Sequence, residues 1–348
     1  MNTAVSFVIP TWNGLSLLQT FLPSVIEAAR FYIAETKSNV EILVVDDGGQ
    51  DATIDWLSEQ KKNTHDVEIN FVRNETNLGF SLTCNKGVAQ ARHRLIFLLN
   101  NDVKVDLDAI APLVEHFTDD SVFAVHCRTY ELESGRECGV GKIGDFKRGF
   151  IRVHQSYSVV NPQNENSVVE LKGEIHAAAP SKFNYSMFAG GGAAMFDRHK
   201  FLSLGGFEHL LSPFYWEDVE LSYRAWKRGF IILYEPDSKV YHRISSTISK
   251  LNRRKVRLIE QRNRLIYHWI HLHDPKMLLS HIAWVWLLAV TAPIRFKPGF
   301  LFATVEALKK LPEINERRRV EKQQAQRSDR KLYALFRDLQ RRNDIAVF

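Results

Sequence analysis

Residues 40–49 read Val-Glu-Ile-Leu-Val-Val-Asp-Asp-Gly-Gly, a β-branched apolar run that ends in two acids and two glycines. Short apolar runs of the same kind occur at residues 5–10, 67–72 and 94–99. Helical patterns separate these runs, at residues 15–34, 51–62 and 80–92. Strands and helices that alternate at this spacing predict an α/β fold with a mostly parallel central sheet and helices on both faces.

Polar residues cluster where three of the expected strands end. The clusters are Pro10-Thr11-Trp12-Asn13-Gly14, Asp46-Asp47-Gly48-Gly49 and Asn100-Asn101-Asp102. In open α/β sheets, ligands bind outside the carboxyl ends of the strands. We therefore expect the three clusters to meet in one crevice.

Each strand-end cluster has more than one interpretation when taken alone. Asp46 and Asp47 can accept hydrogen bonds from a base or ribose, hold a metal, or simply form a turn that Asp51 caps. A single hard carboxylate, Asp102, with amide neighbours suits Mg²⁺ or Mn²⁺, although a strand-end turn is the more common explanation. Small residues at Gly190-Gly191-Gly192 permit a ligand to approach the backbone, or make a bulge.

A second carboxylate cluster opens a helical pattern behind the aromatic loop Pro213-Phe214-Tyr215-Trp216. Glu217, Asp218 and Glu220 occupy the first turn, where outward-pointing N–H groups stabilise negative charge. This placement predicts an ionised carboxylate beside a substrate hydroxyl. We expect Glu220 to pair with Arg224 at the i,i+4 spacing as a structural brace.

Composition restricts the class of protein. The 348 residues carry a net charge of +6, but residues 250–348 hold 22 Lys and Arg against 9 Asp and Glu, and the preceding part is acidic. Three cysteines without a CxxC pair indicate a reducing cytosol and no disulfide framework. The N-terminus lacks the features of a signal peptide. The basic end predicts an anionic partner, and because residues 313–332 contain no aromatic residue we expect a membrane surface and not nucleic acid.

The most apolar run, residues 277–290, is too short to span a bilayer. Trp284 and Trp286, with basic residues on both flanks, favour a helix that lies in the membrane interface, and the alternative is a helix packed on the catalytic body. We expect hairpins and a mobile connection over residues 125–185, and a basic helical region from His242 to the end of the chain. The expected domains are a main α/β domain over 1–248, divided into parts over 1–105 and 106–248, and a helical region over 249–348.

Six motifs resemble those of family 2 glycosyltransferases, in the same order, and especially those of the bacterial rhamnosyltransferase-like members. The motifs are Val8-Ile9-Pro10-Thr11-Trp12-Asn13, Val44-Val45-Asp46-Asp47-Gly48, Asn77-Leu78-Gly79-Phe80, Leu98-Leu99-Asn100-Asn101-Asp102, Gly191-Gly192-Ala193-Ala194-Met195 and Glu217-Asp218-Val219-Glu220-Leu221-Ser222-Tyr223-Arg224. The resemblance covers roughly residues 5–265. It implies that residues 1–248 form the catalytic domain, with the nucleotide sugar bound by residues 1–105 and the acceptor by residues 106–248.

The resemblance implies a GT-A fold, a nucleotide-diphosphate sugar donor, a divalent metal (Mg²⁺ or Mn²⁺), and transfer with inversion to a hydroxyl of a glycan or lipid-linked acceptor in cell-surface polysaccharide biosynthesis. It makes Asp218 the catalytic base, with Glu217 orienting the acceptor, and Asp102 a metal ligand. His242 falls where some members place a further metal or phosphate ligand, although a lone histidine after a strand is more often structural. The residues expected at the nucleotide sugar are Pro10, Thr11, Asn13, Asp46, Asp47, Asn77, Asn100, Asn101, Gly191 and Gly192.

Two departures from the family pattern bear on the expected metal site and on processive synthesis. An amide replaces the first acid of the DxD motif at Asn100, which leaves one firm metal carboxylate. The Trp of the QxxRW motif of processive synthases is absent after Gln261-Arg262-Asn263-Arg264, so a processive synthase is not expected. The alternatives are a nucleotidyltransferase, which should show a basic Gly-rich phosphate loop, and a non-catalytic nucleotide-sugar-binding protein, which would not need the Glu217-Asp218 loop. The expected location is cytoplasmic, at the inner face of the membrane.

Overall fold

The structure is a computed structural model that describes residues 3–159, 184–243, 252–292, 294, 298–342 and 345–347. The polar run at 161–166 and the basic residues Arg295 and Lys297 lie outside the described residues, as does much of the connection expected before residue 185.

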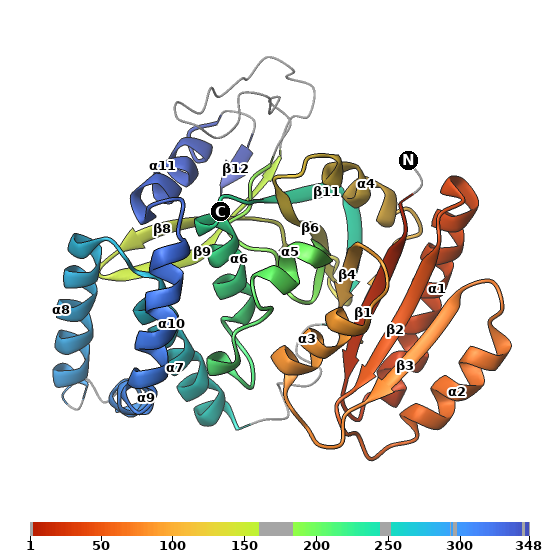
Figure 1. Cartoon of the computed structure of the whole chain (residues 1–348), viewed down its shortest axis with the longest axis horizontal. Coiled ribbons are helices and arrows are strands. Elements are labelled where there is room, and N and C mark those ends of the chain that lie inside the picture. The colour runs from red at the N-terminus through yellow and green to blue at the C-terminus, as the bar shows by residue number, and fades with distance from the viewer. Residues whose placement is uncertain are drawn as a thin grey trace.

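The first hundred residues form the alternating strands and helices that the sequence predicts (Figure 1). The strands are β1 (Val5–Thr11), β2 (Val40–Asp46), β3 (Glu68–Arg73) and β4 (Leu95–Leu99), and the helices between them are α1 (Leu15–Thr36), α2 (Thr53–Asn63) and α3 (Phe80–Gln90). All four strands are parallel, and their order across the sheet is β3-β2-β1-β4. The prediction of a parallel α/β sheet is confirmed for this part.

The strand order reverses between β1 and β4. The chain moves outward from β1 to β3 and then returns past β1 to β4. Because such crossovers are right-handed, α1 and α2 cover one face of the sheet and α3 covers the other. Ligands of open α/β sheets bind at a reversal of this kind, at the carboxyl ends of the strands. The residues at this position are Thr11 and the Asn100-Asn101-Asp102 cluster.

The same sheet continues beyond β4 with strands from the second half of the chain. The order runs β4-β10-β6-β11-β5, and β7 pairs with Thr129 and Tyr130 of β6, beyond the residues of β6 that pair with β10. These strands are β5 (Val103–Val105), β6 (Val122–Glu131), β7 (Glu137–Gly139), β10 (Ala193–Asp197) and β11 (Ile231–His242). β10 and β5 run antiparallel to their neighbours, whereas β6 and β11 are parallel to each other.

Two sequence expectations change here. The prediction of hairpins from residue 125 misses that β6 is a buried central strand of the main sheet. The basic helical region expected from His242 begins later, because β11 pairs with β6 and β5 as far as His242. His242 therefore ends a strand and does not follow one.

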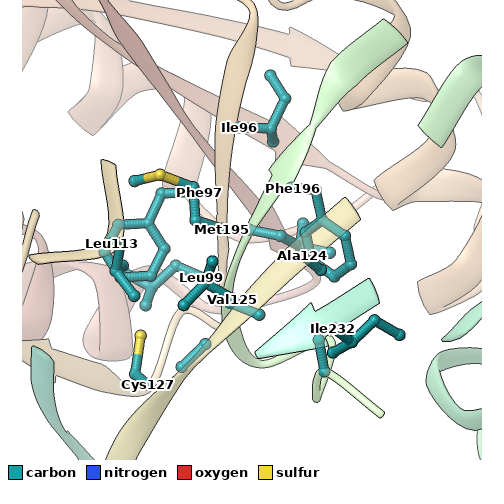
Figure 2. Close-up of a cluster of buried hydrophobic side chains, with 14 of the residues drawn as sticks. Ile96, Phe97, Leu99, Leu113, Ala124, Val125, Cys127, Met195, Phe196 and Ile232 are labelled. Atoms are coloured by element: carbon teal, nitrogen blue, oxygen red, sulfur yellow. The ribbon is translucent and has the colours of Figure 1, made fainter. Parts of the chain in front are cut away.

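The core of the second half lies between β4, β10, β6 and β11 and the helices that cover them. Figure 2 shows Phe97, Met195, Val125 and Phe196 interleaved there, with Ile232 beside them. All of these side chains are almost fully buried. A closely packed core of this kind fixes the positions of the ends of β4 and β11. It therefore also fixes the positions of the polar residues at these strand ends.

A small second sheet carries the end of the chain. It contains β8 (Gly141–Lys147), β9 (Phe150–Val159) and β12 (Ile345–Val347), in the order β12-β9-β8. The prediction that the chain stays helical to its end was therefore wrong for its last residues. β12 pairs antiparallel with β9, with Ile345 buried against it.

The remaining helices are α4 (Ile110–Glu115), α5 (Arg198–Ser203), α6 (Glu217–Lys227), α7 (Arg253–His271), α8 (Pro275–Thr291), α9 (Gly299–Leu308), α10 (Leu311–Gln324) and α11 (Asp329–Leu339). Helices α7 to α11 pack beside α6 and the second sheet (Figure 1). Among the described residues, no helix combines the length and the apolar character that crossing a bilayer requires.

Buried polar contacts attach these C-terminal helices to α6. The carboxylate of Asp329 accepts hydrogen bonds from Lys227 (2.6 Å), the hydroxyl of Tyr223 (2.7 Å) and the backbone N–H groups of His273 and Asp274. Several basic residues of this region bind backbone carbonyls, as Arg318 does with those of Trp269 and Leu272. Part of the basic charge that the sequence assigns to an anionic partner therefore holds the fold together.

Candidate functional site

One hydrogen bond spans the reversal in strand order. The Nδ2 of Asn101, after β4, donates to the Oγ1 of Thr11, at the end of β1 (2.8 Å). Gly14 lies directly against this pair, because a Cβ at position 14 would stand 2.2 Å from Thr11 Oγ1 and 2.4 Å from Asn101 Nδ2. Two of the three predicted clusters therefore meet as expected. Pro10 is buried within β1 and sets the backbone that leads to Thr11.

The two acids after β2 have different surroundings. Asp46 is buried, accepts a hydrogen bond from the N–H of Gly49 (3.1 Å) and lies 3.4 Å from Arg73. Burial raises the pKa of Asp46, against the opposing effects of that N–H and of Arg73. The charge of Asp46 is thus only partly compensated, which leaves it able to accept from a donor group of a ligand.

Asp47 holds the neighbouring loop. Its oxygens accept hydrogen bonds from Asn74 Nδ2 (2.8 Å) and from the backbone N–H groups of Leu78 (2.8 Å) and Gly79 (2.9 Å). This anchoring positions the exposed Asn77 at the rim of the site. On the other side, the Oδ1 of Asn13 accepts from the N–H of Gln50 (2.6 Å) and ties the first loop to the second.

Asp102 and His242 come together from distant parts of the chain. His242 Nε2 lies 3.0 Å from Asp102 Oδ1, because β5 and the end of β11 pair with each other. Asp102 is buried, whereas His242 is partly exposed. The Asp102 carboxylate is a suitable ligand for Mg²⁺ or Mn²⁺, and the neighbouring imidazole favours the softer transition-metal ion Mn²⁺ over Mg²⁺.

The two residues form an incomplete metal site. In the part of the chain that the structure describes, no three or more His, Cys, Asp and Glu side chains gather as a metal site. An ion held by Asp102 and His242 would take its remaining ligands from substrate oxygens and water, as Mg²⁺ commonly does at phosphate sites. The residues present therefore fit a metal that binds together with a diphosphate.

The segment Gly190–Gly192, which leads into β10, lies in space between the end of β4 and the start of α6. The N–H of Asn100 donates to the carbonyl of Gly192 (2.9 Å), and the backbone N–H of Gly191 is directed at the Asp218 carboxylate closely enough to lower its pKa. A Cβ at position 192 would stand 2.8 Å from Asn100 Nδ2, so a larger residue would have to displace the Asn100 side chain. The Gly190–Gly192 segment therefore lies next to both Asp218 and Asn100, and Asn100 is two residues before Asp102.

The pair Glu217 and Asp218 does not carry two full charges. Burial and the charge of Asp218 raise the pKa of Glu217 to about 8. Burial also raises the pKa of Asp218, but N–H groups of Val219 and Gly191 and the charge of Lys142 oppose this shift. We therefore place the negative charge on Asp218 and the proton on Glu217 near neutral pH. The one ionised carboxylate expected at this helix start is therefore assigned to Asp218, and the position at the helix start does not by itself keep Glu217 ionised.

Glu217 and Asp218 also differ in exposure. Glu217 is buried, and its Oε2 has no hydrogen-bond partner among the described residues. Asp218 is partly exposed. A base must reach a substrate, so Asp218 is better placed for proton transfer than its neighbour.

Sequence reasoning missed Lys142, a residue of β8. Its Nζ donates to Ser156 Oγ (2.8 Å), and its charge interacts with Asp218. The N–H of Met187 donates to the carbonyl of Lys142 (2.7 Å), which attaches β8 to the segment that leads into Gly190. No motif around Lys142 indicates this, because its proximity to Asp218 arises only when the second sheet packs on the first.

The loop before Glu217 is held from outside the expected catalytic domain. Asn263 of α7 donates through Nδ2 to the carbonyls of Phe214 and Tyr215 (2.9 Å each). Tyr215 and Trp216 have φ values of 73° and 75°, a conformation that non-glycine residues rarely adopt. Helix α7 therefore supports the backbone that presents Glu217 and Asp218, and no pattern in the sequence indicates this contact.

Comparison with known proteins assigns the family. The profile of the family described as Glycosyl transferase family 2 matches residues 6–201, which is more than half of the chain. The chain belongs to glycosyl transferase family 2. The narrower resemblance to rhamnosyltransferase-like members stays a prediction.

Curated relatives agree with this family. A poly-beta-1,6-N-acetyl-D-glucosamine synthase of Staphylococcus aureus (strain COL) is 23% identical over 253 residues, which cover 73% of this chain and 53% of that protein. The corresponding synthase of Staphylococcus epidermidis is 31% identical over 113 residues, or 32% of this chain and 25% of that protein. The chain thus spans only about a quarter to a half of the length of these relatives.

Solved structures show the same fold at low identity. GalNAc-T7 with UDP, GalNAc and Mn²⁺ has a TM-score of 0.58 at 20% identity, covering 79% of this chain and 49% of that one. A mannosyltransferase of Pyrobaculum calidifontis, in complex with GDP-Man and Mn²⁺, has a TM-score of 0.53 at 17% identity, covering 88% of both chains. S. aureus TarS 1-349 with UDP-GlcNAc has a TM-score of 0.53 at 14% identity, covering 97% and 91%. The predicted GT-A fold is confirmed.

Proposed function

We propose that this chain is an inverting glycosyltransferase that moves a sugar from a dTDP- or UDP-sugar to a hydroxyl of a glycan or lipid-linked acceptor. The observation that carries the proposal is the segment Gly190–Gly192. Its Gly192 carbonyl accepts a hydrogen bond from Asn100, two residues before the metal-ligand candidate Asp102, and the N–H of Gly191 lowers the pKa of Asp218, the base candidate. A leaving diphosphate and an attacking hydroxyl need these two kinds of group on either side of one sugar carbon.

Asp218 takes the role of general base. The acceptor hydroxyl gives its proton to the Asp218 carboxylate while its oxygen forms a bond to C1 of the donor sugar. The bond between C1 and the diphosphate oxygen breaks, and the electron pair leaves with the nucleoside diphosphate. A single displacement of this kind inverts the configuration at C1. Lys142 and the N–H of Gly191 support the charge of Asp218 before the transfer.

The donor would lie across the carboxyl ends of β1, β2 and β4. Asp46 and the Asn13 loop are placed for the nucleoside, and the backbone at Gly191 and Gly192 for the sugar. Asp102 and His242 would hold a divalent ion, which supplies positive charge to the leaving diphosphate when bound. UDP-sugars are favoured by the UDP ligands in the structures of GalNAc-T7 and TarS.

We propose cell-surface polysaccharide biosynthesis as the setting, in the cytoplasm at the inner face of the membrane. The curated relatives are named as poly-beta-1,6-N-acetyl-D-glucosamine synthases, which supports a glycan product. The excess of Lys and Arg over residues 250–348 supports an anionic surface as partner.

A nucleotide-sugar screen tests the proposal. The purified chain is incubated with Mn²⁺ and each of a set of dTDP-, UDP- and GDP-sugars, and release of the nucleoside diphosphate is followed. Release from one dTDP- or UDP-sugar, with an anomeric proton of inverted configuration by NMR, is the expected result. If a donor binds and the chain turns over none of the donors, the chain is a non-catalytic nucleotide-sugar-binding protein. Release of pyrophosphate from a nucleoside triphosphate would indicate a nucleotidyltransferase.

A further inference from the structure

Exposed large apolar side chains concentrate on two neighbouring helices, α8 and α9. Of the 17 such side chains among the described residues, 11 fall between residues 279 and 311: nine on α8 and α9, Ile294 between these helices, and Leu311 at the start of α10. We call these eleven the α8–α9 face; its members are Leu279, Ile282, Trp286, Leu287, Val290, Ile294, Leu301, Phe302, Val305, Leu308 and Leu311. Isolated apolar residues on a surface need no explanation, but a contiguous set of this kind marks an interaction site.

The outer side of α8 has no charged residue at all. Between Met277 and Ala292 the sequence contains no Asp, Glu, Lys or Arg. Leu279, Ile282 and Trp286 recur at helical spacing on the outside, where Leu279 is 69% and Trp286 66% exposed. A helix that faced only water would carry charges on this side.

The inner side of α8 packs on the protein. His281 and Val285 are buried, and His281 Nδ1 bonds the carbonyl of Gly149 in the turn between β8 and β9 (2.7 Å). Trp284 also faces inward, against Gly149. The sequence placed Trp284 and Trp286 together at an interface, whereas the structure directs only Trp286 outward.

Basic residues surround the α8–α9 face. Lys276 is exposed at the start of α8 and Lys309 at the end of α9. The first turn of α7, which packs against α9, exposes Arg253, Arg254 and Lys255. The only acid between residues 275 and 310 is Glu306, which pairs with Lys309 (2.6 Å). An apolar centre with a cationic rim complements the acyl chains and headgroups of an anionic membrane.

We propose that the α8–α9 face inserts into the interfacial layer of an anionic lipid membrane, with α8 lying in the membrane plane. This inference rests on the proposed membrane contact and adds that apolar insertion, and not charge alone, holds the protein there. An in-plane position follows because one side of α8 is occupied by protein. A second copy of the chain fits less well, because two copies meeting at this face would oppose their cationic rims.

Vesicle co-sedimentation tests the inference. The full chain is mixed with vesicles of phosphatidylcholine, with and without an equal part of phosphatidylglycerol, at low and high salt. The double variant Leu279→Ser/Trp286→Ser is compared with Leu107→Ser, which alters an exposed leucine (52%) far from this face. Since burying a large apolar side chain contributes about 1.5–3 kcal/mol, the double variant should bind anionic vesicles at least about tenfold more weakly. Leu107→Ser should bind like the wild type, and part of the wild-type binding should survive high salt.

Trp286 supplies a second readout. Brominated lipids should quench the tryptophan fluorescence of the wild type and quench that of Trp286→Phe clearly less. Binding that high salt abolishes and that the double variant leaves unchanged would show attachment by charge alone and overturn the insertion. No binding to either vesicle would overturn the membrane contact itself, and a dimer that the double variant dissociates would replace lipid with a second copy. Donor hydrolysis, measured without vesicles, should be equal in all variants, so that a failure of the proposed function is recognised separately.

Discussion

His242 Nε2 lies 3.0 Å from the Oδ1 of Asp102, although 140 positions separate the two residues in the sequence. The contact depends on the antiparallel pairing of β5 with the last residues of β11. We propose that it gives the DxD position, which has amides at Asn100 and Asn101, a second metal-ligating group from another strand. An imidazole can therefore substitute for the acid that the motif lacks.

Removing either member of this pair should weaken metal-dependent donor binding. Asp102→Ala should abolish the thermal stabilisation that UDP or dTDP produces with Mn²⁺, and His242→Ala should reduce it. Asp108→Ala, an exposed acid six residues further on, is the matched control and should behave like the wild type. Equal nucleotide stabilisation in the presence of EDTA would contradict a metal at Asp102.

The anchoring of the 74–79 loop predicts an effect on donor affinity without an effect on chemistry. Asp47→Asn replaces a carboxylate that accepts three hydrogen bonds with an amide. Both carboxylate oxygens accept from donor groups, so the NH₂ group of the amide would have to face one of these donors and could not accept from it. Bonds to a charged group contribute about 1.5–3 kcal/mol each, so we expect the donor KM to rise about tenfold or more. The kcat should change little, because Asp47 does not contact the reacting atoms. Asp55→Asn, on the exposed side of α2, should leave both parameters unchanged, and an unaltered KM in Asp47→Asn would show that the loop does not bind the donor.

The raised pKa of Glu217 predicts a pH dependence of stability. In the folded protein this pKa is about 8, above its ordinary value of 4.5, so the folded state holds a proton that the unfolded state has lost between these pH values. The stabilisation is complete below pH 4.5 and disappears as the pH rises through 8, with a slope of up to about 1.4 kcal/mol per pH unit. Glu217→Gln removes this slope, and urea denaturation at several pH values measures it. The exposed Glu316→Gln should keep the wild-type slope, and a slope that persists in Glu217→Gln would place the titrating group elsewhere.

The free energy of unfolding at acid pH should depend on Glu220. Burial alone would raise the pKa of Glu220, but the charge of Arg224 and the contact with His271 lower it to about 2. Its contribution is therefore present above pH 4.5 and lost as the pH falls towards 2. Because Glu220→Gln leaves the buried Arg224 without a carboxylate, we expect a loss of about 3–5 kcal/mol in the free energy of unfolding at pH 7. A loss no larger than that of Glu316→Gln would show that the pair is not a structural brace.

The strand-end clusters could be predicted from the sequence because parallel topology brings the carboxyl ends of strands to one edge. Thr11, Asp46 and Asn101 needed only the alternating apolar runs to be placed together. The i,i+4 pair of Glu220 and Arg224 was equally accessible, and the structure confirms it.

Contacts made by packing between distant elements could not be predicted. Lys142 reaches Asp218 only through the second sheet, and Asn263 supports the Phe214–Tyr215 backbone from a helix after residue 252. The strand β12 consists of Ile345-Ala346-Val347, too few residues for a period-2 pattern to identify. The apolar run at 277–290 likewise shows no periodicity that separates Trp284 from Trp286, since almost every position in it is apolar.

The most direct test of the central claim compares transfer rates in Asp218→Asn and Glu217→Gln. The amide is nearly isosteric with the carboxylate, so both variants should fold and bind the donor. If Asp218 is the base, its variant should lose about 10²–10⁴-fold in kcat, the usual range for a general base. Glu217→Gln should lose much less, because Glu217 is already neutral near pH 7. Near-normal turnover in Asp218→Asn, together with an inactive Glu217→Gln, would contradict the assignment of the base to Asp218.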